Sequence, residues 1–274
     1  MRNLPLLALI PLTILTGCED EEMGLLEALA ALDEVNQSSR GEAATSEVIE
    51  ISTDFTIGGA LQDAAQAVAD FWESQADCAE VSVQGNVTTI DYGTLEDSCT
   101  WQGRTYAGVN TVTIQSTTPG ELQLLHDWAG FTNGDVTVDG GATVTWSGND
   151  LTRRVQTEHT WTDTGGAQVD VVGDHISGRI DEDKPVWESG FTLDGTRDWT
   201  SDSGDWTLEM TDLELRLVDP APQAGSIDLI NPANKSLTIL YERVDEDTIQ
   251  ATLQGLRGGD RVYHIDRLGI PEEI

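Results

Sequence analysis

Basic residues are scarce in this 274-residue chain, and lysine is almost absent. The two lysines are Lys184 and Lys235, and the 14 Lys and Arg residues face 49 Asp and Glu residues, which gives a formal net charge of −35. A surface this acidic repels phosphate backbones and anionic lipid headgroups. The composition therefore excludes nucleic-acid binding. The simplest interpretation of the acidic charge is a well-solvated surface rather than a charge-based activity.

The sequence also lacks an apolar run long enough to cross a membrane as a helix. The longest run, residues 4–15, is about a dozen residues long and contains two prolines, whereas a spanning helix needs about 20 apolar residues. One basic residue precedes this run, and the small residues Thr16 and Gly17 follow it. This order is typical of a secretory signal peptide, so we expect residues 1–17 to be a leader.

Cysteine is rare as well, and one of the three cysteines directly follows this leader. The stretch Leu15-Thr16-Gly17-Cys18 resembles the lipobox of bacterial lipoproteins. The resemblance implies cleavage between Gly17 and Cys18, a lipid on the thiol of Cys18, and an acyl chain such as palmitate on the new amino group. The implied partner is therefore a lipid bilayer, contacted through acylated Cys18, because several acyl chains together give stable anchoring.

The residues after Cys18 bear on location. Residue 19 is Glu, not the aspartate that accompanies inner-membrane retention in some enteric lipoproteins. The resemblance thus implies the bacterial cell envelope, and the outer membrane rather than the inner one. The acidic run 19–22 repels an anionic surface, which leaves the anchoring to the acyl chains. An ordinary cleaved leader followed by a chance cysteine is the alternative interpretation.

The two remaining cysteines are Cys78 and Cys99. Disulfides persist in exported proteins, so we predict that these two residues are bonded to each other if Cys18 carries lipid. The bond would close a loop of about 20 residues and stabilise the fold by about 3 kcal/mol. A zinc site is a weaker alternative, because no CxxC or CxH spacing accompanies either residue.

Two helical segments are predicted near the N-terminus. Residues 18–53 are polar and acidic, and we expect them to form a lipid-anchored tether. The tether contains a short predicted helix, whose leucine stripe begins at Leu25 and which ends at the break Ser38-Ser39-Arg40-Gly41. Residues 61–76 place Ala, Val, Phe and Trp at i, i+3, i+4 and i+7, the pattern of an amphipathic helix. We expect this to be the one substantial helix of the folded body.

After Cys78 the apolar period changes from helical to two. Thr, Val and Trp alternate with polar residues, and turn residues recur about every 8–12 positions, which is the signal of an all-β domain. No helix separates the strands, so hairpins are expected. The predicted fold class is mainly β: a large antiparallel meander, open, rolled or sandwiched, with an N-terminal amphipathic helix. The body is expected at residues 54–219, followed by a C-terminal meander at 220–274 that extends the main sheet.

Four turn signals set the expected strand registers. Asp194-Gly195 predicts a hairpin that places Leu193 opposite Thr196. The loop 201–204 predicts a second hairpin that places Trp199 opposite Trp206. Two glycine pairs, 140–141 and 165–166, predict two further hairpins.

The sequence supplies no constellation that predicts chemistry. It has no GxSxG elbow, HExxH motif or P-loop. The four histidines are His126, His159, His175 and His264. His159 and His175 flank the hairpin predicted at residues 165–166, but the strand register leaves them offset, so we predict no metal site there. The acidic clusters 181–183, 198–205 and 245–247 lack the order of an EF-hand loop and fit hairpin loops, with loose Ca²⁺ binding as the alternative. We therefore predict no catalytic, cofactor-binding or metal-binding residue.

Tryptophan is frequent, with eight residues against four tyrosines. We expect these rings to fill the core, with an aromatic binding groove as the alternative. The threonine-, valine- and tryptophan-rich body resembles uncharacterised β-rich lipoproteins of Gram-negative envelopes, a resemblance of texture that transfers no catalytic residue. The sequence therefore favours a non-enzymatic envelope lipoprotein with a structural, adhesion or ligand-binding role. The alternatives are a carrier of lipid or another apolar ligand in a rolled sheet, and a hydrolase of envelope polymers.

Overall fold

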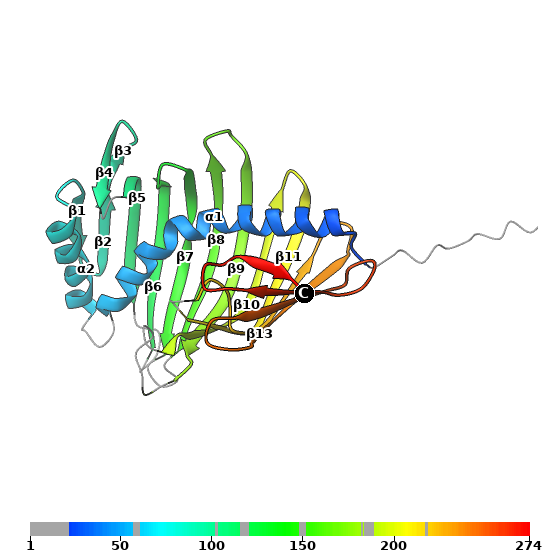
Figure 1. The fold of residues 1–274 in the computed structure, drawn as a ribbon. Helices are drawn as coiled ribbons and strands as arrows, with labels where there is room; N and C mark the ends of the chain where they lie inside the picture. Colours follow the sequence, from blue (N-terminus) through cyan, green and yellow to red (C-terminus); the bar gives the residue numbers. More distant parts are fainter. Residues whose placement is uncertain are drawn as a thin grey trace, which may run out of the picture.

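The computed structural model describes residues 22–56, 61–101, 104–115, 121–147, 152–181, 183, 189–216 and 219–274. Within these residues the chain forms one antiparallel sheet of 16 strands (Figure 1), and nearly every strand pairs with its neighbours in sequence. The exception is the hairpin of β3 and β4, which attaches to β5 beside the main path. The fold is thus mainly β and antiparallel, as predicted, and the sheet is open.

The strands are β1 (Glu80–Gln84), β2 (Val87–Asp91), β3 (Gly93–Thr94), β4 (Asp97–Trp101), β5 (Arg104–Gln115), β6 (Glu121–Thr132), β7 (Val136–Ser147), β8 (Thr152–Asp163), β9 (Gln168–Arg179), β10 (Phe191–Ser201), β11 (Gly204–Leu215), β12 (Ala224–Ile230), β13 (Ser236–Arg243), β14 (Ile249–Gln254), β15 (Arg261–Ile265) and β16 (Pro271–Glu273). Strands β12 to β16 continue the same sheet.

Two helices cover one face of the sheet. Helix α1 (Leu25–Thr56) crosses the strands, and helix α2 (Leu61–Gln75) packs at the end formed by β1 and β2 (Figure 1). The predicted helix at 61–76 is confirmed as α2, whose Trp72 is fully buried. Within the part of the chain that the structure describes, neither helix is long and apolar enough to cross a membrane.

The sheet has an inner face that packs against the helices and an outer face that does not. Strand β8 shows the pattern: Val155 and Trp161 are buried, whereas the alternate residues Arg154 and Glu158 are exposed. The alternation follows from the pleat, which sends successive side chains to opposite faces. Most tryptophans lie on the inner side or against α2, as the core interpretation predicts: Trp72, Trp101, Trp128, Trp161, Trp199 and Trp206 are buried.

The predicted break at Ser38-Ser39-Arg40-Gly41 is wrong, because α1 runs through it for 32 residues. The hydroxyls of Ser38 and Ser39 both donate to the backbone carbonyl of Val35, at 2.9 and 2.8 Å, so they bond within the helix. Gly41 lies against the sheet, where a Cβ atom would come within 2.6 Å of Trp161 Cδ1. The small residues therefore allow close approach to the sheet rather than ending the helix.

Two of the predicted hairpins are wrong for a related reason. Asp194-Gly195 and Gly140-Gly141 lie inside β10 and β7, so Leu193 does not pair with Thr196. A Cβ atom on Gly195 would come within 2.2 Å of the Asp174 carbonyl oxygen on the neighbouring strand. Glycine is needed at these positions because another backbone approaches closely, and the strands are about twice as long as the turn signals suggested.

The other two predicted hairpins are confirmed. Residues 165 and 166 lie in the turn between β8 and β9. Trp199 pairs directly with Trp206, and their rings stack with centroids 5.9 Å apart. The connection between these strands is one residue pair tighter than predicted, because Ser201 already pairs with Gly204.

The predicted disulfide is present between Cys78 and Cys99, whose Cα atoms are 5.1 Å apart. It joins the segment after α2 to β4. The predicted leader, which ends at Gly17, and Cys18 after it lie outside the described residues.

Candidate functional site

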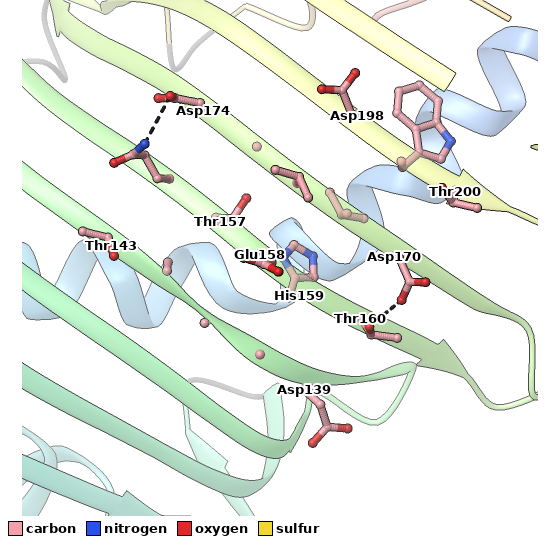
Figure 2. Close-up of a pocket in the computed structure, with 18 of the residues that line it drawn as sticks. Asp139, Thr143, Thr157, Glu158, His159, Thr160, Asp170, Asp174, Asp198 and Thr200 are labelled. Carbon is pink, nitrogen blue, oxygen red and sulfur yellow. Dashed lines mark hydrogen bonds between the residues drawn. The ribbon is translucent and has the colours of Figure 1, made fainter. Parts of the chain in front are cut away.

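The outer face of the sheet carries a regular pattern of acids and threonines over β7 to β11. One cross-strand row reads Asp139, Thr160, Asp170, Thr200 and Asp205, one residue from each successive strand. Figure 2 shows the first four of these side chains in line across the strands. The row places threonine between each pair of acids, which keeps like charges from facing each other directly.

Hydrogen bonds hold these carboxylates in place. Thr160 Oγ1 donates to Asp170 Oδ1 at 2.5 Å (Figure 2), and Thr200 Oγ1 donates to Asp205 Oδ1 at 2.8 Å. In the next row, Thr207 Oγ1 donates to Asp198 Oδ1 at 2.7 Å. Each hydroxyl takes one lone pair of its carboxylate and leaves the others for a ligand.

An exposed apolar residue, Val172, lies among four of these acids. Glu158 and Asp198 pair with Val172 from the two neighbouring strands, while Asp170 and Asp174 are two residues away along β9. Directly paired residues have Cβ atoms about 5 Å apart, and residues two apart on a strand are about 7 Å apart. Val172 is 53% exposed, so its methyl groups form an apolar spot inside a ring of negative charge.

The face is hollowed around this spot. The hollow has a volume of about 1090 Å³ and is lined by residues of β6 to β11. This volume is slightly above the usual range of small-molecule sites, about 300–1,000 Å³. Gly141, which pairs with Glu158, adds no side chain to the floor of the hollow. The hollow is open and can admit a side chain or an extended segment of another molecule.

Positive charge is nearly missing from this face. Among the outward-facing described residues of β6 to β11, Arg154 is the one basic side chain. Its Nε donates to Asp174 Oδ1 at 2.7 Å, and Gln156 Nε2 donates to Asp174 Oδ2 at 3.2 Å. The hydrogen bond and charge of Arg154 lower the pKa of Asp174 below its ordinary value. Among the residues that the structure describes, the other three acids of the ring around Val172 have no basic neighbour on this face.

The sequence reasoning missed this face, since it assigned the acidic cluster 198–205 to a hairpin loop. That assignment is wrong for Asp198 and Asp205, which lie within β10 and β11. The available signal was the period of two in Glu158-x-Thr160 and Asp170-x-Val172-x-Asp174. Acids at alternate positions of a strand share one face, whereas acids in turns do not.

The histidines sit elsewhere. His126, His159 and His175 occupy the inner side of the sheet and do not converge as metal ligands. His175 pairs with Val155, four residues from His159, so the predicted offset is confirmed. Within the described residues no group of three or more His, Cys, Asp or Glu side chains has the geometry of a metal site.

Comparison with known protein families, with curated proteins and with solved structures gives no significant match. The class of protein therefore rests on the fold and the site alone. It is a protein built on an open antiparallel sheet, with one face covered by helices and the other exposed, acidic and hollowed.

Proposed function

We propose that this chain is a lipid-anchored lipoprotein of the bacterial envelope that acts by binding, not by catalysis. Its binding surface is the hollow on the outer face, and its partner presents basic side chains. The lipobox at Leu15-Thr16-Gly17-Cys18 supports the anchoring and the envelope location, with the outer membrane favoured. Acyl chains on Cys18 would hold the acidic body at the bilayer without help from charge.

The observation that carries the binding function is the ring of four acids around exposed Val172. Lys and Arg side chains have an apolar stem and a charged head. A stem that lies over Val172 would bring its head within reach of Glu158, Asp170 or Asp198. Complementary charge of this kind gives an interface its specificity and raises the association rate.

The two alternative functions receive less support. A carrier needs an apolar space for its ligand, but the apolar face of this sheet packs against α1 and α2. A hydrolase of envelope polymers needs a carboxylic acid whose pKa is raised. In the hollow, the pKa of Asp174 is shifted in the opposite direction.

The proposal is tested by titrating the purified protein with a short oligolysine peptide in a calorimeter. We compare the wild type with the triple variant Glu158→Gln, Asp170→Asn, Asp198→Asn. The variant removes three charges from the ring and should weaken binding by at least about tenfold. The loss should shrink as salt is added, since salt screens exposed charges.

The matched control removes the same number of exposed acids from the end of the molecule formed by α2 and β1 to β4: Glu73→Gln, Glu80→Gln, Glu96→Gln. The control should bind as the wild type does, within about twofold. If the two triple variants lose affinity equally, the peptide senses only net charge, and the outer face is not the binding surface.

A further inference from the structure

Three of the four histidines lie on the inner side of the sheet, two of them, His159 and His175, near Glu42 of α1, and the binding function proposed above does not use them. His126, on β6, and His159, on β8, are each 3% exposed. The ring of His126 contacts Asn110 Oδ1 at 3.3 Å, and neither ring nitrogen of His159 has a hydrogen-bond partner among the described protein atoms. His175 lies two strand positions beyond Gly173 on β9. Burial lowers the pKa of all three histidines, that of His126 to about 4.

The charged groups that face these histidines come from several elements. Glu42 of α1 acts on both His159 and His175 and favours their charged forms. Arg197 of β10 disfavours the charged forms of both histidines, and Arg153 of β8 disfavours the charged form of His175. Asp174, next to His175 in sequence, favours the charged form of that residue.

The remaining member of the cluster is the ion pair that connects α1 to the sheet. Arg197 Nη1 donates to Glu42 Oε2 at 2.7 Å and to Ser39 Oγ at 2.9 Å. The side chains of Arg197 and Glu42 are 10% and 27% exposed.

Helix α1 is held on the sheet by small residues, by a few larger apolar residues and by polar contacts. Its buried residues include Ala28, Ala31, Ser38 and Gly41, and nearer its C-terminal end Val48 and Ile49. Besides the Glu42 pair, Glu27 pairs with Lys235 at 2.8 Å. Glu34 accepts hydrogen bonds from Ser201 and Ser203, and Arg40 pairs with Asp163. Detachment of α1 breaks these contacts but none of the strand pairings, so it costs less than unfolding of the sheet.

We propose that α1 is a strap that acid releases: protonation of the histidines beneath it detaches the helix from the sheet while the strands stay folded. The packing at Gly41 explains why detachment is needed. A Cβ atom there would come within 2.7 Å of His159 Nε2, so the docked helix lies directly against this ring nitrogen. A buried imidazolium must be hydrated or paired with an opposite charge. Detachment of α1 lets water hydrate it.

The direction of the effect follows from linkage. A histidine whose pKa is lowered by folding binds its proton more tightly when the site opens. The docked state is therefore favoured above the ordinary histidine pKa of about 6.5 and loses that advantage as the pH falls below it. Release would uncover the inner face of the sheet, where Trp128, Trp161 and Trp199 lie.

The test is amide hydrogen exchange of the purified protein at pH 7 and pH 5, corrected for the intrinsic exchange rates. The protection of α1 should fall at least about tenfold at the lower pH, while the protection of β6 to β9 changes by less than about threefold. In the double variant His159→Gln, His175→Gln, the fall in α1 should become markedly smaller. His264→Gln, on β15, is the matched control and should leave the fall unchanged.

A second variant keeps the test decisive if the double variant does not fold. Glu42→Gln removes the ion pair with Arg197, so the protection of α1 should already be reduced at pH 7 while the strands stay protected. The proposal is overturned if α1 protection does not depend on pH. It is also overturned if α1 and the strands lose protection together, because that result means global unfolding.

Discussion

At the scale of single residues, Gly41 decides how closely α1 approaches the sheet. It is the helical residue that lies directly on His159 and Trp161. Alanine is a better helix former than glycine by about 1 kcal/mol, which favours the substitution. The added methyl group, however, would lie 2.6 Å from Trp161 Cδ1, so the helix would have to shift.

We therefore predict that Gly41→Ala lowers the free energy of unfolding by about 1–3 kcal/mol, because overpacking outweighs helix propensity. Urea denaturation followed by tryptophan fluorescence measures the change. Asn36→Ala, at an exposed position of the same helix, is the control and should be neutral or slightly stabilising. A stabilised Gly41→Ala variant would mean that α1 does not rest on the sheet at this point.

His126 predicts a pH dependence of stability. Its pKa in the folded protein is about 4, below the ordinary value, because the ring is buried. The neutral ring is favoured by folding, so this contribution to stability is complete above pH 6.5 and is lost as the pH falls from 6.5 toward 4. A shift of this size corresponds to about 3 kcal/mol at most.

The substitution His126→Gln should flatten the fall in unfolding free energy between pH 6.5 and pH 4, whatever its effect at neutral pH. Urea titrations at a series of pH values measure the slope. The His264→Gln variant should keep the wild-type slope. An unchanged slope in His126→Gln would show that this ring is not the group that takes up the proton.

At the scale of elements, helix α2, the loop between β10 and β11 and the pairing of Trp199 with Trp206 could be predicted from local pattern. These features depend on residues close together in the sequence. The lengths of β7 and β10 could not be predicted, because Gly140 and Gly195 look like turn residues. They are glycine because a neighbouring strand approaches them closely, and that neighbour is set by the whole sheet.

Gly195 offers a test of this interpretation. Its φ angle is 148°, and a Cβ atom would come within 2.2 Å of the Asp174 carbonyl oxygen. We predict that Gly195→Ala costs at least about 2 kcal/mol of stability, since backbone strain and overpacking act together. Thermal and urea unfolding measure the loss.

The comparison is Gly166→Ala, in the turn between β8 and β9. Gly166 also has a positive φ angle, but nothing lies within 4 Å of its Cβ position. Its substitution should cost about 1 kcal/mol, from strain alone. Equal costs at the two positions would indicate that Gly195 lies in a turn after all.

At the scale of the whole molecule, the period of two after Cys78 predicted the antiparallel sheet and the scarcity of basic residues predicted its acidic surface. The path of α1 could not be predicted. Its covered face combines Ala, Ser, Gly and Thr residues with Val48 and Ile49. Leu25 and Leu29 of the predicted leucine stripe are exposed, so the apolar period does not reveal the docked face. The hollow could not be predicted either, because Val172 and the acids around it come from three strands whose registers appear only in the folded sheet.

The central claim is that the outer face binds a basic partner around Val172. Two neighbouring valines of β9 test it most directly, since Val172 is 53% exposed on the outer face and Val171 is 1% exposed on the inner face. Methyl NMR spectra of valine-labelled protein are recorded as the oligolysine peptide is added. The account predicts that the Val172 methyl signals shift in a saturable way while those of Val171 stay in place. Shifts at Val171 without shifts at Val172, or no shift at either despite binding, would contradict it.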